Sequence, residues 1–189
     1  MTKKIRLGVL TLVALSALAL VTAAVAHRVV VIKGTNQGET LAGTAGNDLV
    51  LARAGDDTVN AGEGNDQVLG MRGNDTLNGE GGNDRMHGGP GNDALNGGAG
   101  NDVLRGGHGN DTVNGDDGDD NIWAGRGADV LNGGAGNDRI HAIARDRMVD
   151  TIDCGPGDDV VWLNSKESDV TTNCETVKTV TTSHPDDGE

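Results

Sequence analysis

Aspartate recurs every nine residues through the middle of this chain, from Asp48 to Asp138, without an insertion or a deletion. One further unit upstream has Glu39 in the place of the aspartate, so twelve units of nine residues tile residues 34–141. Tandem repetition at a short fixed period is typical of solenoids, in which each unit packs only against its neighbours. The recurring acids are Glu39, Asp48, Asp57, Asp66, Asp75, Asp84, Asp93, Asp102, Asp111, Asp120, Asp129 and Asp138.

Each unit has fixed and tolerant positions, numbered here one to nine so that Asp102 is at position six of the unit 97–105. Position eight is always apolar, which predicts a three-residue strand with its central side chain pointing inward. The glycine-rich hexapeptide before it predicts a tight turn, because glycine adopts positive φ without steric cost. This glycine density excludes a helix. Position four is Gln37 once and otherwise Gly46, Gly55, Gly64, Gly73, Gly82, Gly91, Gly100, Gly109, Gly118, Gly127 and Gly136.

Position nine alternates between two kinds of residue, so the structural period is eighteen residues. Odd-numbered units carry Ala42, Asn60, Asn78, Asn96, Asn114 and Asn132, and even-numbered units carry Leu51, Leu69, His87, Arg105, Trp123 and His141. With two units in each coil of the solenoid, the odd-numbered units lie on one sheet and the even-numbered units on the other. The asparagines of the odd-numbered units should then stack as a ladder about 4.8 Å apart. We therefore expect an all-β fold: a parallel β-roll, or two-sheet β-solenoid, with capping strands at both ends.

Stacked turns would place their carboxylates about 5 Å apart, where like charges repel. Calcium relieves this repulsion, because it binds six to eight oxygens from carboxylates and backbone carbonyls, and glycine leaves the carbonyls accessible. The aspartates at position six, with the glycines at position four, are therefore the predicted ligands. Five gaps between six turns on each edge allow at most about ten Ca²⁺. Zinc prefers Cys and His clusters, and magnesium rarely uses an all-protein cage.

Composition supports a role for a cation. The chain has a net charge of −14, two Trp, and no Phe or Tyr. Such a chain is either disordered or completed by a bound cation, and its charge argues against nucleic acid as a partner. Turn formation alone is the alternative explanation for the aspartates, but it does not require Asp in eleven consecutive units.

The units resemble the RTX, or haemolysin-type, calcium-binding nonapeptide. The match is clear at residues 88–95, 106–113 and 133–140. The resemblance implies a parallel β-roll in which the position-six aspartates and the turn carbonyls bind Ca²⁺. Unit one departs from the pattern at Gln37 and Glu39, which makes Glu39 a weaker candidate ligand. Many members of that family carry a toxin or enzyme domain and a C-terminal export signal, whereas this chain has an N-terminal signal.

Residues 1–26 have the pattern of a Sec-type signal peptide. Three basic residues precede an almost wholly apolar run, and Ala24-Val25-Ala26 fits a cleavage site. We expect a secreted protein with no membrane insertion after cleavage and a net charge of −17. An uncleaved membrane anchor is the alternative, since the run is just long enough to span a bilayer.

The flanking segments are interpreted as caps. Residues 27–33 predict an N-terminal capping strand. Residues 142–182 predict degenerate repeats, with Asp159 as a further candidate ligand, followed by a disordered tail at 183–189. Cys154 and Cys174 predict a disulfide in an exported chain, with two free thiols as the alternative.

No H-E-x-x-H or G-x-S-x-G motif occurs, and we expect no enzymatic activity. The favoured function is a calcium-driven structural or surface-associated protein, a monomer whose protein or polysaccharide partner the sequence does not identify. The alternative is a carbohydrate- or cell-surface-binding module that uses Arg105, Trp123 and His141 on the variable face. Such a column is also explained as a tolerant outer surface.

Overall fold

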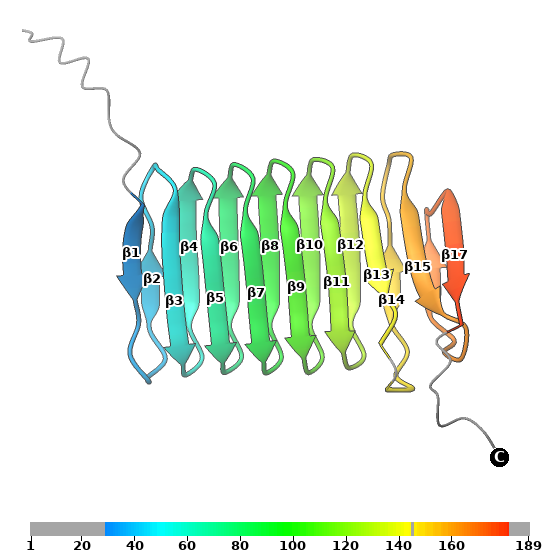
Figure 1. Cartoon of the computed structure of the whole chain (residues 1–189), viewed down its shortest axis with the longest axis horizontal. Helices are drawn as coiled ribbons and strands as arrows, with labels where there is room; N and C mark the ends of the chain where they lie inside the picture. The colour runs from blue at the N-terminus through cyan, green and yellow to red at the C-terminus, as the bar shows by residue number, and fades with distance from the viewer. Residues whose placement is uncertain (1–28, 145, 182–189) are drawn as a thin grey trace, which may run out of the picture.

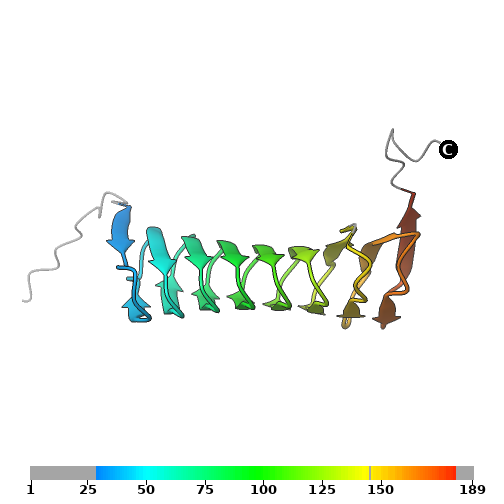
Figure 2. The ribbon, with the colours of Figure 1, turned by 90° about the horizontal axis from the view of Figure 1, so that it is seen from below.

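The computed structural model describes residues 29–144 and 146–181. Within them the chain forms seventeen strands and no helix, wound into a flat two-layered solenoid (Figures 1 and 2). All strand pairs are parallel, and the two sheets contain nine and eight strands. The predicted parallel β-roll is therefore confirmed. The expectations for the signal peptide and for the tail at 183–189 lie outside the described residues.

The odd-numbered strands form the nine-stranded sheet: β1 (Val30–Lys33), β3 (Asp48–Ala54), β5 (Gln67–Arg72), β7 (Arg85–Pro90), β9 (Val103–His108), β11 (Asn121–Arg126), β13 (Arg139–Ala142), β15 (Val160–Asn164) and β17 (Thr176–Val180). The even-numbered strands form the eight-stranded sheet: β2 (Thr40–Ala42), β4 (Thr58–Glu63), β6 (Thr76–Gly81), β8 (Ala94–Ala99), β10 (Thr112–Asp117), β12 (Val130–Ala135), β14 (Thr151–Asp153) and β16 (Val170–Thr172).

The register between coils follows the predicted eighteen-residue period. Leu95 in β8 pairs with Val113 in β10, which pairs with Leu131 in β12. These position-eight side chains are fully buried and form the core between the sheets. The asparagine ladder is also present, since the side chain of Asn96 donates to that of Asn78 at 2.8 Å and accepts from that of Asn114 at 2.7 Å.

The predicted three-residue strand is too short. Strands β4 to β12 have six residues each, running from position seven of one unit to position three of the next. Gly98 has a φ of +102°, yet it pairs within the sheet with Glu80 and Asp116, whose φ values are +72° and +71°. Because position two has positive φ in every unit from Arg53 to Gly134, these coils bend in the same way and the ladder is not interrupted. The tight turn is therefore confined to positions four to six.

The coils after residue 142 keep the sheet pairing but lose the fixed period. Arg139 pairs with Val160, and Val160 pairs with Thr176. The predicted disulfide between Cys154 and Cys174 is present, with a Cα–Cα distance of 5.1 Å. Across residues 29–144 and 146–181, no helix has the length and apolar character needed to cross a membrane.

Candidate functional site

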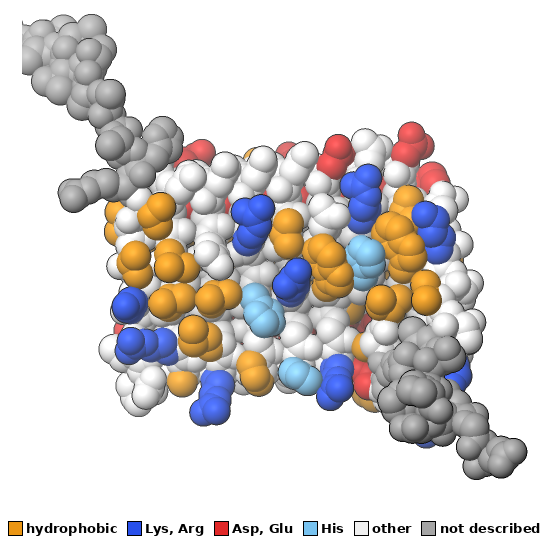
Figure 3. Space-filling view, viewed as in Figure 1, with side chains coloured by type: hydrophobic (Ala, Val, Ile, Leu, Met, Phe, Trp, Pro, Cys, Tyr) orange, Lys and Arg blue, Asp and Glu red, His pale blue; other side chains and the backbone are white. Residues whose placement is uncertain are grey.

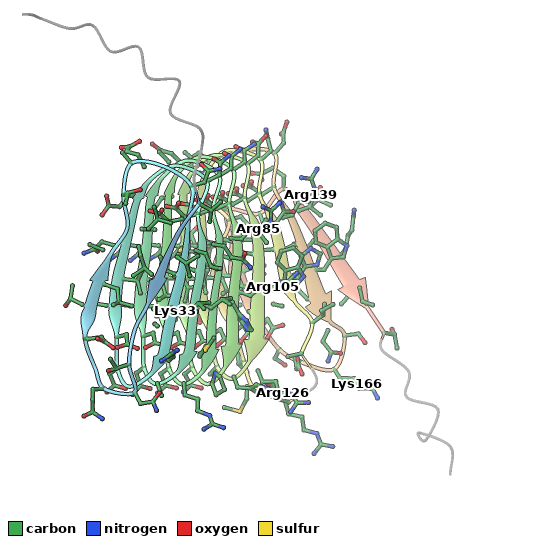
Figure 4. All side chains as sticks on the ribbon, turned by 60° about the vertical axis from the view of Figure 1, so that its left-hand side comes forward. Lys33, Arg85, Arg105, Arg126, Arg139 and Lys166 are labelled. Atoms are coloured by element: carbon green, nitrogen blue, oxygen red, sulfur yellow. A yellow bond between two sulfur atoms is a disulfide. The ribbon has the colours of Figure 1, made fainter. Side chains whose placement is uncertain are left out.

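Two columns of buried carboxyl groups follow the two turn edges of the roll. In each column, the backbone N–H of one acid donates to the Oδ1 atom of the acid one coil further on, as from Asp84 to Asp102 at 2.7 Å and from Asp93 to Asp111 at 2.8 Å. The position-six aspartates are between 0% and 3% exposed. The turns that carry Asp48 and its equivalents, called here the Asp48 edge, lead from a strand of the eight-stranded sheet to the next strand of the nine-stranded sheet. The turns that carry Glu39 and its equivalents, called here the Glu39 edge, make the return connection. Figure 4 shows oxygen-bearing side chains along both edges.

Both columns extend beyond the twelve repeats. On the Glu39 edge, Asp129 donates to Asp150 and Asp150 donates to Asp169, each through its backbone N–H. On the Asp48 edge, Asp138 donates to Asp159 and Asp159 donates to Glu175. Sequence reasoning had identified only Asp159 as a candidate ligand among these four C-terminal acids.

Of the other three acids, Asp150 falls in a degenerate repeat of the sequence but was not among the predicted ligands, and the irregular spacing hid Asp169 and Glu175. Two of them are followed two residues later by an apolar side chain, Ile152 after Asp150 and Val177 after Glu175. This is the relation between positions six and eight in the regular repeat. Asp169 lacked that signal, because Thr171 occupies the equivalent place.

The second oxygen of most of these carboxyl groups has no hydrogen-bond partner. Within the part of the chain that the structure describes, the buried oxygens without a partner are Oδ1 of Asp48 and Oδ2 of Asp57, Asp66, Asp75, Asp84, Asp93, Asp102, Asp111, Asp120, Asp129, Asp138, Asp159 and Asp169. A buried charged oxygen without a partner is costly. The two turn edges therefore present rows of oxygens suited to a cation.

Backbone carbonyls lie next to these oxygens. The Oδ2 atom of Asp84 and the carbonyl oxygen of Gly97 are each 2.3 Å from the point that a Cβ on Gly79 would occupy. The same arrangement recurs at Gly115, where Asp120 and a carbonyl of the next coil approach that point to 2.2 Å. Glycine at position one therefore leaves room for a carboxylate oxygen and a carbonyl oxygen to share one small volume.

The position-four glycines predicted as ligands lie at the turns themselves. Nearly all have positive φ, including +119° at Gly82 and +135° at Gly100; Gly46 is the exception. The carbonyl oxygen of Gly82 is 1.9 Å from the point that a Cβ on Gly100 would occupy. Glycine is required here by both conformation and close packing, and the turn carbonyls stack from coil to coil.

Position five forms a further ladder, which is exposed and runs in the opposite direction. The backbone N–H of Asn83 donates to Oδ1 of Asn65 at 2.7 Å, one coil earlier. The position-six bonds point one coil later instead. The two ladders therefore brace each turn against both of its neighbours.

Burial raises the pKa of these carboxyl groups, and repulsion between neighbouring carboxylates adds to the effect. The pKa rises to about 7 for Asp84, Asp111 and Asp120, and to about 6 for Asp93 and Asp138. The hydrogen bond from the adjacent backbone N–H acts in the other direction. Full ionisation of the columns at neutral pH therefore needs a compensating positive charge.

The variable-face residues form a stack on the nine-stranded sheet. The rings of Trp123 and His141 are 4.9 Å apart, and those of His141 and Trp162 are 4.4 Å apart, with nearly parallel planes. Arg105 lies over Trp123 at 5.0 Å, and Lys178 lies over Trp162 at 4.9 Å. Sequence reasoning placed Trp123 next to His141, but it did not extend the column to Trp162 and Lys178 in the C-terminal coils.

The donor set of the two turn edges fits calcium better than a transition metal. In the described ranges 29–144 and 146–181, no three His, Cys, Asp or Glu side chains cluster so that they could hold a metal. An ion at a turn would therefore combine carboxylate with carbonyl oxygens, a set that calcium accepts. The carboxylate oxygens without partners would be its first ligands.

Comparison with known proteins agrees with this geometry. The family model of the RTX calcium-binding nonapeptide repeat matches four times, at residues 33–68, 62–95, 87–122 and 114–142. Together these matches cover more than half of the chain, including both regular columns of aspartates. No match to a curated protein was found.

Proposed function

The chain belongs to the RTX calcium-binding nonapeptide repeat family, and on that premise we propose that it is a secreted calcium-binding protein whose folding is driven by Ca²⁺ bound between its stacked turns. Its role is structural or surface-associated. Calcium that binds the folded roll and not the unfolded chain stabilises the roll by mass action.

The observation that carries this proposal is the row of buried carboxylate oxygens without hydrogen-bond partners. Oδ1 of Asp102 accepts a hydrogen bond from the neighbouring coil, while Oδ2 has no hydrogen-bond partner and approaches the same point at Gly97 as the carbonyl oxygen of Gly115. A calcium ion supplies the missing partner and removes the repulsion between successive carboxylates. The ligands proposed are the position-six aspartates with the turn carbonyls of the position-four glycines.

The C-terminal coils add ligands to both edges. Asp150 and Asp169 continue the Glu39 edge, and Asp159 and Glu175 continue the Asp48 edge. The ceiling of about ten ions inferred from the regular repeats therefore rises if these coils also bind. Glu39 begins its edge and accepts a hydrogen bond from the backbone N–H of Thr35, so we propose that it is a weaker ligand.

Export and a monomeric state are part of the proposal. The disulfide between Cys154 and Cys174 is compatible with an oxidising compartment, and the N-terminal segment has the pattern of a cleaved signal. Calcium is the partner that the repeats require. We propose no catalytic role for the roll.

A second candidate function is binding of a carbohydrate or cell-surface ligand through the column of Arg105, Trp123 and His141. The observation in its favour is a hollow of about 350 Å³ beside this column, lined in part by Trp123 and His141. This function is compatible with the first, because the hollow lies on a sheet face and the calcium ligands lie on the turns.

Circular dichroism of the mature protein tests the main proposal. Calcium added to metal-free protein at neutral pH should produce a cooperative gain of sheet signal, and chelation should reverse it. Magnesium at the same concentration serves as the control and should produce little change. A sheet signal that persists unchanged after exhaustive chelation would refute calcium-driven folding.

A further inference from the structure

The two sheets of the roll carry opposite charge. Among the described strands, the nine-stranded sheet contains eight Lys or Arg residues, all exposed, and one acid, Asp48, which is buried. The eight-stranded sheet contains five acids and no Lys or Arg. The basic residues are Lys33, Arg53, Arg72, Arg85, Arg105, Arg126, Arg139 and Lys178, and the acids are Glu63, Glu80, Asp116, Asp117 and Asp153. This separation is unexpected in a chain whose net charge is −14.

The outer surface of the nine-stranded sheet, called here the basic face, is visible in Figure 3. Lys, Arg and His side chains lie among hydrophobic ones, and acidic side chains lie mainly toward the rim. Figure 4 shows Arg85, Arg105 and Arg139 on successive parts of this face. Calcium bound at the turns would neutralise the buried carboxylates, so that these would no longer offset the positive charge of the basic face.

Three shallow hollows follow one another along the basic face, and each contains positive or imidazole side chains. The first has a volume of about 290 Å³ and is lined by Arg53 and Arg72. The second has a volume of about 190 Å³ and includes Arg85 and Arg105. The third, of about 350 Å³, includes Arg126. Each is at the lower end of, or below, the range for drug-sized ligands, so the series suits successive units of a chain molecule.

The width of the face limits the ligand further. A six-residue strand is about 20 Å long, and the turns at both of its ends carry mainly exposed asparagines at position five, with a single acid on each edge of the regular repeats, Asp56 and Asp119. A thin linear polyanion can lie along the basic face within this width.

The aromatic residues do not offer ring faces to a ligand. Trp123 is covered by Arg105 on the side of β9 and by His141 on the side of β13. Trp162 is covered in the same way by His141 and Lys178. Proteins that bind single-stranded nucleic acid without sequence preference stack bases on open aromatic faces. The stack therefore disfavours nucleic acid and leaves charge as the main source of recognition.

From these observations we propose that the basic face binds a linear polysaccharide that carries carboxylate groups, with the acidic sugars placed at the hollows. Arginine suits this ligand because its guanidinium donates two parallel hydrogen bonds to one carboxylate. This inference deepens the second candidate function, and it rests on the proposed calcium-stabilised roll because the face exists only when the coils are stacked. The segregation of charge argues for a polyanion, and the strand length of about 20 Å limits its width.

Calorimetric titration of the calcium-loaded mature protein with short oligogalacturonates tests the proposal. Neutral maltodextrins of the same length serve as the ligand control. We expect binding of the acidic oligosaccharide alone, weakened by added salt because the contacts are exposed. The double substitution Arg72→Gln with Arg85→Gln should lower the affinity about tenfold.

The matched control is Arg147→Gln with Lys166→Gln, which removes the same charge outside the nine-stranded sheet and should leave the affinity unchanged. Circular dichroism of each sample separates failure of the roll from failure of the face. A folded protein that binds no oligogalacturonate would overturn the inference, as would equal loss in both double variants. Tighter binding of single-stranded DNA, or self-association without added glycan, would assign the face to nucleic acid or to a second copy instead.

Discussion

The backbone N–H of Asp84 donates to Oδ1 of Asp102 at 2.7 Å, while Oδ2 of Asp102 is buried without a hydrogen-bond partner. One carboxyl group thus joins two coils through one oxygen and offers the other to a cation. Repeated along both edges, this relationship would couple the stacking of coils to the binding of calcium, as the proposed function requires. It also explains why the motif needs Asp at this position and not merely a turn-forming residue.

The substitution Asp102→Asn separates these two roles. Asparagine keeps an acceptor for the N–H of Asp84 but replaces the charged Oδ2 with an amide. In calcium, the free energy of unfolding should fall by about 1–3 kcal/mol, and the calcium midpoint should rise. Without calcium, the variant should be at least as stable as the wild type, because a buried charge has been removed. Asp117→Asn, on an exposed strand residue, is the control; equal effects of both variants would contradict this account.

The stability of the calcium-free roll should increase in acid. Burial raises the pKa of Asp84, Asp111 and Asp120 to about 7, from 3.8. Since the folded-state pKa is the higher one, the stabilisation is complete below pH 4 or so and is lost as the pH rises toward about 7. Circular dichroism of calcium-stripped protein should show more sheet at about pH 5 than at about pH 8, because these two conditions lie on either side of the raised pKa values.

The calcium-loaded roll should respond to pH in the opposite sense. Calcium binds the ionised carboxylates, so the calcium concentration needed for folding should rise as the pH falls below about 7. A calcium midpoint that does not change between pH 8 and roughly pH 5 would be incompatible with buried aspartates as ligands.

Two glycines of one unit should differ in their response to substitution by alanine. Gly100→Ala places a Cβ at a φ of +135° and 1.9 Å from the carbonyl oxygen of Gly82, so we expect a loss of stability of about 1–3 kcal/mol or more. Gly97→Ala meets Oδ2 of Asp102 at 2.3 Å and the carbonyl oxygen of Gly115 at 2.6 Å. Because Ala52 occupies the same position in another unit, this change should be tolerated by the fold and should mainly weaken calcium binding.

Thermal unfolding in calcium, combined with calcium titration, measures both effects for each glycine variant. The expected pattern is a lower melting temperature for Gly100→Ala and a higher calcium midpoint for Gly97→Ala. The reverse pattern would show that the contacts at positions one and four have been assigned the wrong roles.

Reduction of the disulfide should loosen the C-terminal coils. Cys154 is buried at the end of β14, and Cys174 precedes β17. The closed loop spans 20 residues, for which the chain-entropy model gives about 3 kcal/mol. Reduced protein in calcium should melt at a lower temperature than oxidised protein, and hydrogen exchange should accelerate first in β16 and β17. An unchanged melting temperature would mean that the C-terminal coils do not limit the stability of the roll.

The regular part of this fold could be predicted from the sequence because its constraints repeat. Asn96 revealed the eighteen-residue period, and Trp123 was correctly placed beside His141. The length of the strands was not predictable from residue types, because Gly98 looks like a turn residue and pairs in a sheet only because its neighbours bend in the same way.

The C-terminal coils show where sequence periodicity ceases to be informative. Register steps of 21, 19 and 16 residues replace the step of 18, so Asp169 and Glu175 could not be aligned with the regular acids. The opposite charges of the two sheets were also hidden, because adjacent units alternate between sheets and mix their charges along the chain. Both features emerge only when the coils are stacked.

Location of calcium in a crystal of the mature protein tests the central claim most directly. Data collected near the calcium absorption maximum should show two rows of anomalous peaks, one along each turn edge, beside the Oδ2 atoms of residues such as Asp102 and Asp111. Rows of ions in contact with both carboxylate and carbonyl oxygens are the predicted result. A roll that crystallises in saturating calcium with no peaks beside these oxygens would contradict the account.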